Sequence, residues 1–269
     1  MKKVVLITGG SSGIGKSIGE FLSSNGYVVY GSSRNPKRIL NSKFPLVQID
    51  VRDTSSIETA IMEIVEKEGR LDILINNAGV GITGPIEEIP SIEIENHFKV
   101  NLFGPIDVIK AVLPTMRKQH SGLIINITSI AGYMGLPYRG IYSSSKSALE
   151  MITEALRMEV KAFGIEVTNV APGDFATNIA SGRYHAPVLS NSPYKEVYQM
   201  SLDMMDEHVD TGGDPQEMAT AILRIIETPK PAVRYKVGPA MQKFSLVLKK
   251  VLPSKMYEKI LMNHYKIKA

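Results

Sequence analysis

Short apolar segments alternate along the chain with longer amphipathic ones. Seven β-rich apolar runs, bounded by Gly, Asn, Asp or Pro, predict strands over residues 3–8, 27–32, 46–50, 72–76, 122–128, 165–171 and 233–237. The stretches between them show helical periodicity near residues 13–24, 55–68, 91–118, 140–163 and 214–227. This alternation is typical of βαβ units around a parallel sheet. We therefore expect an α/β fold, in which residues 1–269 form a single domain with helices on both faces of a seven-stranded parallel sheet.

Two segments depart from this alternation. Residues 176–213 hold scattered glycine, proline and asparagine residues and are longer than ordinary connections, so we expect an irregular substrate lid, with a surface insertion as the alternative. Residues 239–269 mix leucine and valine with several lysines and predict a basic amphipathic C-terminal extension. Such a helix can pack on its own domain or on a partner subunit, and peripheral membrane contact is the alternative.

Composition then removes several classes of protein. The 269 residues are 43% hydrophobic and contain no cysteine, which excludes disulfides, thiolate metal sites and cysteine nucleophiles. The five histidines have no ligand spacing, so we expect no metal. The small formal charge of +4 gives no reason to expect nucleic-acid binding. Since no apolar run approaches the ~20 residues of a membrane span, we expect no integral span and a cytoplasmic protein.

A glycine-rich loop directly follows the first predicted strand and leads into the first helix. Glycines let the backbone turn sharply and approach a pyrophosphate, while the free amides at the helix start face its charge. The strand, loop and helix order predicts a dinucleotide site of the Rossmann type. Its predicted residues are Thr8, Gly9, Ser11, Ser12, Gly13, Ile14 and Gly15.

The spacing Thr-Gly-x-x-x-Gly-x-Gly resembles the short-chain dehydrogenase/reductase family, and further motifs of that family follow in order. They are Asp50 with Val51, the run Asn76-Asn77-Ala78-Gly79, Asn101, Ser129, Tyr142-x-x-x-Lys146, and Pro172-Gly173 with Thr177. The resemblance covers residues 4 to about 177, together with the helix and strand that end near residue 237. It implies that Asp50, Val51, Asn77, Ala78, Gly79, Tyr142, Lys146, Pro172, Gly173 and Thr177 also contact the cofactor.

The end of the second strand favours NADP(H). An acidic side chain there would bind the ribose hydroxyls of NAD, but this chain has Ser33 and Arg34, which can bind a 2′-phosphate. Ser12 stands where many NADP-binding relatives carry a second basic residue, so NAD(H) stays open as an alternative cofactor.

Tyr142 and Lys146 are four residues apart on a predicted helix, so both project from one face. A nearby ammonium group favours the phenolate form of a tyrosine. Ser129 follows an apolar strand, at the sheet edge where ligands bind in doubly wound folds. The resemblance implies that Ser129 polarises the substrate, that Tyr142 transfers the proton, and that Lys146 also holds the nicotinamide ribose.

Pro105 lies four residues after Asn101 and has no amide to donate to the Asn101 carbonyl. A water held at that carbonyl could connect Lys146 to solvent, which is the relay role that the resemblance gives this asparagine. A helix kink without chemical function is the alternative.

The substrate prediction rests on bulky apolar residues after Ser129 and near Phe175. The predicted substrate residues are Ser129, Met134, Leu136, Tyr142 and Phe175, with Ile179 and Tyr184 as further candidates. They suit a lipophilic ketone, aldehyde or secondary alcohol, although Arg183 and His185 could recruit a carboxylate. The tail is loosely similar to that of hydroxysteroid and retinol dehydrogenases.

Other functions stay open at this point. A non-catalytic NADP(H)-binding regulatory scaffold, a membrane-peripheral lipid-binding protein, and dehydratase or epimerase chemistry are the alternatives. The resemblance also implies a homodimer or homotetramer formed through the helices near 91–118 and 140–163.

Overall fold

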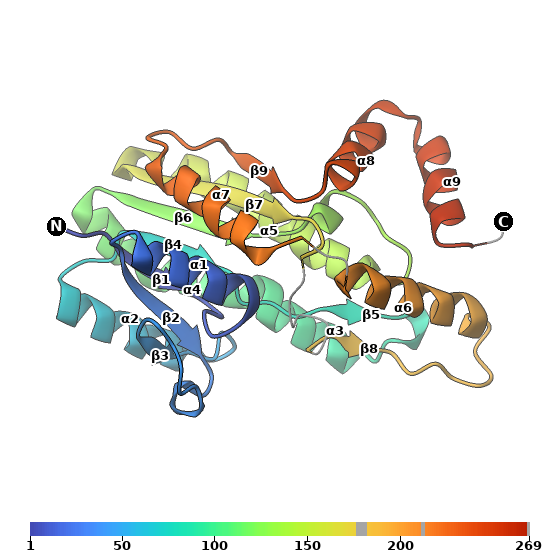
Figure 1. The fold of residues 1–269 in the computed structure, drawn as a ribbon, viewed down its shortest axis with the longest axis horizontal. Coiled ribbons are helices and arrows are strands. Elements are labelled where there is room, and N and C mark those ends of the chain that lie inside the picture. The colour runs from blue at the N-terminus through green and yellow to red at the C-terminus, as the bar shows by residue number, and fades with distance from the viewer. Residues whose placement is uncertain (176–181, 211–212, 268–269) are drawn as a thin grey trace.

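A single parallel sheet of seven strands runs through the computed structural model, which describes residues 1–175, 182–210 and 213–267 (Figure 1). Its strand order is β3-β2-β1-β4-β6-β7-β9. The order reverses direction between β1 and β4, as in doubly wound folds. The predicted fold class and all seven predicted strands are confirmed. The strands are β1 Val4–Ile7, β2 Val28–Ser33, β3 Leu46–Gln48, β4 Ile73–Asn76, β6 Gly122–Ile127, β7 Ile165–Pro172 and β9 Arg234–Val237.

Alternate residues of the central strands supply two separate apolar layers. In β1, Val4 and Leu6 pack with α2 (Thr54–Glu68), α4 (Gly104–Gln119) and α5 (Gly140–Glu159). Val5 and Ile7 face the opposite side, where they pack with α1 (Gly13–Ser24) and α7 (Pro215–Glu227). Because both faces of the sheet are covered, its inner strands are continuous apolar runs rather than alternating ones.

Helix ends follow the local chemistry of the chain. The carboxylate of Asp53 accepts a hydrogen bond of 3.0 Å from the Ser55 amide at the start of α2, and Gly69 ends that helix with φ of 71°. Asp214 likewise caps α7, directly before a proline at its first position. These caps fix the bounds of two helices that cover opposite faces of the sheet.

The region around Asn101 contains a π-helical turn instead of a continuous α-helix. It spans Lys99–Phe103, between α3 (Ser91–Phe98) and α4, and the Gly104 amide bonds the Lys99 carbonyl. A bond of this longer spacing accommodates Pro105, which cannot donate to Asn101. The predicted departure from regular helix is therefore present, and it takes the form of one widened turn.

The expectation of an irregular segment over 176–213 is wrong for its second half. Residues Lys195–Asp210 form the helix α6, whose Tyr198, Ser201 and Met205 are buried at spacings of three and four. Earlier in the segment, β8 (Tyr184–His185) pairs in parallel with β5 (Ile82–Thr83), a contact of two residues on each strand. Such a short, distant pairing leaves no periodic signal in the sequence.

The C-terminal extension forms two helices, α8 (Ala240–Val251) and α9 (Ser254–His264), joined by a bend at Leu252-Pro253. They stand beside the end of β9 at one end of the molecule (Figure 1). Within the described residues, no helix combines the length and apolar character needed to cross a bilayer. The remaining short helical turns lie at Pro36–Arg38, Ile86–Glu88, Ile130–Tyr133 and Lys161–Phe163.

Candidate active site

The glycine loop between β1 and α1 presents backbone rather than side chains to the cavity beside it. Gly9 and Gly13 have φ values of 65° and 51°, which favour glycine. A Cβ on Gly15 would lie 2.5 Å from both the Gly9 carbonyl oxygen and the Asn77 amide nitrogen, so only glycine fits there. Ser12 precedes α1 and makes no side-chain cap hydrogen bond to it. The start of α1 is thus shaped to receive an anion.

Thr8 and Asn77 hold this loop against the end of β4. The Thr8 hydroxyl accepts hydrogen bonds of 3.0 Å from the backbone amides of Asn77 and Ala78, and the Asn77 side chain donates to the Thr8 carbonyl at 3.0 Å. The Gly9 amide donates to the Ser32 hydroxyl at 3.1 Å. Thr8 and Gly15 therefore hold the loop in its conformation from the side that faces away from the cavity.

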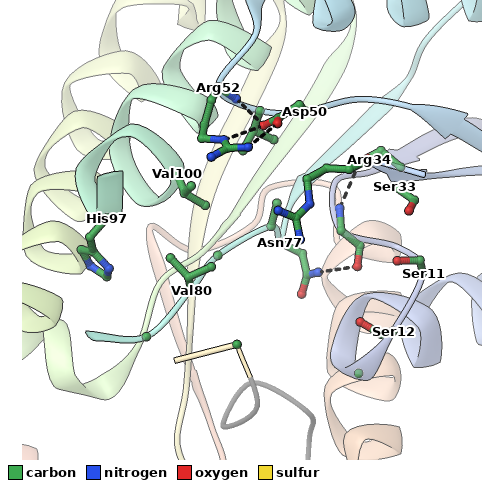
Figure 2. A pocket seen from close by; sticks show the side chains of 18 of the residues that line it. Ser11, Ser12, Ser33, Arg34, Asp50, Arg52, Asn77, Val80, His97 and Val100 are labelled. Carbon is green, nitrogen blue, oxygen red and sulfur yellow. Dashed lines mark hydrogen bonds and ion pairs between the residues drawn. The ribbon is translucent and has the colours of Figure 1, made fainter. Parts of the chain in front are cut away.

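A cavity of about 580 Å³ extends along the loop (Figure 2). Most of the predicted cofactor residues line it, namely Gly9, Ser11, Ser12, Gly13, Ile14, Ser33, Arg34, Asp50, Val51, Asn77, Ala78 and Gly79. The structure thus brings together residues at or directly after the ends of β1, β2, β3 and β4, which the sequence motifs placed in one site. Thr177 and Ile179 lie outside the described residues.

One end of this cavity is strongly basic. Arg34 is exposed at the end of β2, beside Ser33 (Figure 2). Arg52 lines the same end and makes hydrogen bonds of 3.0 and 2.6 Å to the two carboxylate oxygens of Asp50. These bonds lower the pKa of Asp50, although its partial burial works against them. Arg52 was not predicted from the sequence. A second basic residue was sought at the position of Ser12, and Arg52 could have been identified in its place.

Lys146 is buried beneath the cavity floor on α5. Its ammonium nitrogen donates a hydrogen bond of 3.1 Å to the Ile127 carbonyl at the end of β6, and lies 6.0 Å from the centre of the Tyr142 ring. Burial lowers the pKa of Lys146, and the neighbouring Tyr142 acts in the opposite direction. The helical spacing of four residues therefore places both side chains together, as predicted.

A smaller cavity of about 100 Å³ lies beside these two residues and shares Ile14, Asn77 and residues 79–82 with the larger one. Its lining includes Ser129, Tyr142, Lys146, Pro172, Gly173 and Phe175. Ser129 starts the turn Ile130–Tyr133, and its hydroxyl oxygen accepts a hydrogen bond of 3.1 Å from the Ala131 amide. The Ser129 hydroxyl proton can therefore point to a ligand in this cavity.

Asn101 is fully buried and bonds the backbone of the segment that follows β4. Its side-chain oxygen accepts from the Val80 amide and its nitrogen donates to the Val80 carbonyl, both at 2.8 Å. The same nitrogen lies 3.2 Å from Nε2 of His97, which in turn lies 2.9 Å from the Ser145 hydroxyl. Sequence reasoning treated His97 as a scattered histidine, although it stands four residues before Asn101, a spacing that places two side chains on one face of a helix.

Two arginines line the smaller cavity, and neither was predicted to lie beside the catalytic residues. The Arg139 guanidinium lies 5.3 Å from the centre of the Tyr142 ring, and Arg183 enters from the segment before β8. Arg183 had been noted only as a possible carboxylate partner. Arg139 sits one helical turn before Tyr142, a spacing that could have indicated it.

Met134 and Leu136 do not lie in the environment expected of substrate-binding residues. Met134 is buried against Leu246 of α8 and Tyr257 of α9, and Leu136 packs partly on the same cluster. Neither is among the residues that line the two cavities. In the described part of the chain, no group of three or more acidic or histidine side chains is placed to hold a metal ion.

The fold and this site define the class of protein: a doubly wound α/β enzyme with a serine, a tyrosine and a lysine beside a glycine-rich loop. The family model for short chain dehydrogenases matches residues 3–187. The chain belongs to that family and is an oxidoreductase acting on alcohol or carbonyl groups.

Individual relatives match over nearly the whole chain. A 3-ketodihydrosphingosine reductase of Bacteroides thetaiotaomicron is 40% identical, with 99% of each chain covered. An NADPH-dependent 3-dehydrocapnine reductase of Ornithobacterium rhinotracheale is 31% identical, with 96% of this chain and 95% of the relative covered. The crystal structure of a short-chain dehydrogenase from Streptomyces avermitilis superposes with a TM-score of 0.84 at 30% identity, covering 99% of this chain and 97% of that one.

Proposed function

We propose that the protein interconverts a lipophilic secondary alcohol and its ketone with NADP(H) as the cofactor, and that it works on a long-chain 3-keto lipid. One observation carries this proposal. Ser129, Tyr142 and Lys146 converge on a small cavity that is continuous with a much larger one along the glycine loop. A dinucleotide in the larger cavity would end beside the three polar side chains.

The residues present fit a phosphorylated dinucleotide. The positive φ values of Gly9 and Gly13 and the uncapped start of α1 suit the pyrophosphate. Arg34 with Ser33 suits a 2′-phosphate, and the Arg52 guanidinium adds positive charge nearby. Opposite the loop, a Cβ on Gly79 would lie 3.4 Å from the Lys146 ammonium nitrogen, which supports close approach of the ribose to Lys146. When bound, the cofactor supplies or accepts the hydride.

Side chains of the protein then transfer the proton and stabilise the charge that develops. In the reducing direction, Tyr142 donates its hydroxyl proton to the carbonyl oxygen, while the Ser129 hydroxyl donates a hydrogen bond to that oxygen. Lys146 stabilises the phenolate that remains, because the two side chains lie together in a buried site. In the oxidising direction the Tyr142 phenolate accepts the proton of the alcohol, while Ser129 and Lys146 keep the same positions.

The substrate class is supported by the walls of the smaller cavity and by the relatives. Ile82, Ile127 and Phe175 give it apolar surface, and Tyr138, Tyr184 and Tyr198 extend the apolar cluster next to it. Two relatives that span almost the whole chain are named as reductases of 3-keto long-chain lipids. Arg139 and Arg183 would face the polar end of such a lipid. We propose further that residues 182–210, which include β8 and α6, cover the bound substrate as a lid.

The test is the loss of NADPH absorbance with 3-ketodihydrosphingosine and with smaller lipophilic ketones. Tyr142→Phe should lower turnover by about a hundredfold or more while NADPH still binds, because only proton transfer is removed. Tyr27→Phe, distant from both cavities, should behave as wild type. Full activity of Tyr142→Phe would contradict the mechanism. Tight NADPH binding by wild type without turnover of any ketone would favour a regulatory scaffold, and turnover without net NADPH oxidation would favour epimerase or dehydratase chemistry.

A further inference from the structure

The helix α8 turns an apolar stripe toward solvent. Met241, Phe244, Val247 and Val251 are 79, 53, 52 and 73% exposed, and their spacing places them within about 120° of one another around the helix axis. We call these four residues the outer face. A surface helix ordinarily shows polar residues in this position. Four adjacent exposed apolar side chains therefore indicate a surface that meets something other than water.

This outer face is additional to the packed side of the same helix pair. Leu246 on α8 and Tyr257 on α9 are buried against Met134, and the Tyr257 hydroxyl lies 2.9 Å from the Met134 sulfur. Lys249 of α8 stacks on the Tyr257 ring at 5.2 Å. The two helices are thus already seated on the body of the protein by their inner side, and Figure 1 shows them projecting from its end. A partner can therefore cover the outer face without any rearrangement of the two helices.

Positive charge is concentrated around the outer face. Residues 239–269 contain seven lysines and one acidic residue, Glu258, which gives this segment a formal charge of +6. The whole chain carries +4, so residues 1–238 carry −2. Lys243 and Lys250 are exposed and border the apolar stripe on α8. The positive excess of the protein therefore belongs to this extension.

We propose that the outer face docks the protein onto an anionic lipid bilayer. An apolar stripe bordered by lysines has the arrangement of interfacial helices, whose apolar side enters the headgroup boundary while lysines attract anionic lipids. A second copy of the chain is a poorer occupant, because two extensions of charge +6 would repel each other. Charge complementarity thus favours a membrane surface over self-association.

Docking through the outer face would place the substrate cavity close to the bilayer, from which a lipid substrate would come. Met134, beneath the helix pair, belongs to the loop between Ser129 and Tyr142. Burial raises the pKa of Tyr265, just after α9, and the positive charge of Arg139 on the same loop opposes this shift. Delivery of a long-chain ketone from the bilayer rests on the proposed function, whereas docking itself does not.

The chain offers a clean optical test because it contains no tryptophan. Phe244→Trp places a single fluorophore on the outer face, and Met62→Trp, at a position 55% exposed on α2, is the matched control. Vesicles of phosphatidylglycerol and phosphatidylcholine in equal parts should shift the emission of Phe244→Trp to the blue and leave Met62→Trp unchanged. Pure phosphatidylcholine should give little shift, and salt should weaken the binding.

Sedimentation with the same vesicles then measures which residues matter. Phe244→Ser with Val251→Ser should weaken binding by about tenfold or more, since two apolar side chains no longer enter the bilayer. Lys250→Glu should weaken it by several fold on anionic vesicles only. Binding is measured without any substrate, and reduction of a short, water-soluble ketone should stay at the wild-type rate in these variants. Failure of docking is thereby distinguishable from failure of the proposed reaction.

Two results would overturn the proposal. One is the absence of binding to anionic vesicles by the wild-type protein at low salt. The other is a wild-type dimer that Phe244→Ser converts to monomers with no effect on vesicle binding, which would make the outer face a contact between two copies.

Discussion

The Asn101 side chain and the Val80 backbone exchange two hydrogen bonds of 2.8 Å. The side chain thus pairs with the segment after β4 as the backbone of a neighbouring strand would. This exchange fixes the orientation of the Asn101 amide, because its oxygen must accept and its nitrogen must donate. The second hydrogen on that nitrogen then faces Nε2 of His97. The same imidazole nitrogen lies 2.9 Å from the Ser145 hydroxyl, so Asn101 and Ser145 both contact the buried His97.

Asn101→Ala should lower both stability and turnover. Two buried backbone groups of Val80 would lose their partners, at about 1 to 3 kcal/mol of stability each if no water replaces them. If the Asn101 region also relays protons from Lys146, turnover should fall about tenfold and its pH profile should shift. Asn263→Ala, exposed on α9, is the control. An Asn101→Ala enzyme with unchanged turnover and unchanged pH profile would leave this residue a purely structural role.

His97 should make the protein less stable in mild acid. Burial, and to a smaller extent the charge of Lys146, lower the pKa of His97 from 6.5 to about 4. As pH falls through this range the unfolded chain gains a proton that the folded protein excludes, so stability decreases from above pH 6.5 down to about pH 4. Between pH 7 and pH 5 the loss should be about 2 kcal/mol.

Urea unfolding at the two pH values checks this prediction. His97→Gln removes the titrating group and keeps a side chain that can bond Ser145, so its stability should change less between pH 7 and pH 5 than that of wild type. His120→Asn alters an exposed histidine at a left-handed turn and should retain the wild-type difference. An identical pH dependence in wild type and His97→Gln would show that His97 does not stay neutral in the fold.

The contrast between His97 and the glycine loop shows what sequence alone could predict. The strands were predictable because sheets covered on both faces need continuous apolar runs, and the loop because glycine tolerates the φ values of Gly9 and Gly13. Tyr142 and Lys146 followed from helical spacing. Each of these signals is local along the chain.

The features that were missed have different causes. His97 is four residues before Asn101 and Arg52 is two residues after Asp50, but no pattern in the sequence showed that these side chains would line the cofactor cavity. The pairing of β5 with β8 joins residues about a hundred positions apart. The helix α6 was missed because glycine and proline signals in the first half of its segment outweighed the buried spacing of Tyr198, Ser201 and Met205.

Arg34 should determine the preference for NADPH over NADH. In Arg34→Asp a carboxylate would repel the 2′-phosphate that the guanidinium binds, so the KM for NADPH should rise about tenfold to a hundredfold. The KM for NADH should stay constant or fall. Arg38→Asp makes the same charge change at a nearby exposed position outside the cavity and should alter neither value. A parallel rise of both KM values would instead assign Arg34 a general role in shaping the loop.

The long helix α5 carries exposed apolar side chains, and we propose that they form a contact in a dimer or tetramer. Met151 and Met158 lie seven residues apart on one side of α5, and Phe103 is exposed directly before α4. Glutamates at both methionines would place charges in the apolar contact, where burying an unpaired carboxylate is strongly unfavourable. Met151→Glu with Met158→Glu should therefore shift the mass measured by light scattering to that of one chain. Met62→Glu, comparably exposed on α2, should leave the assembly intact. An oligomer that survives both substitutions would have to use another surface.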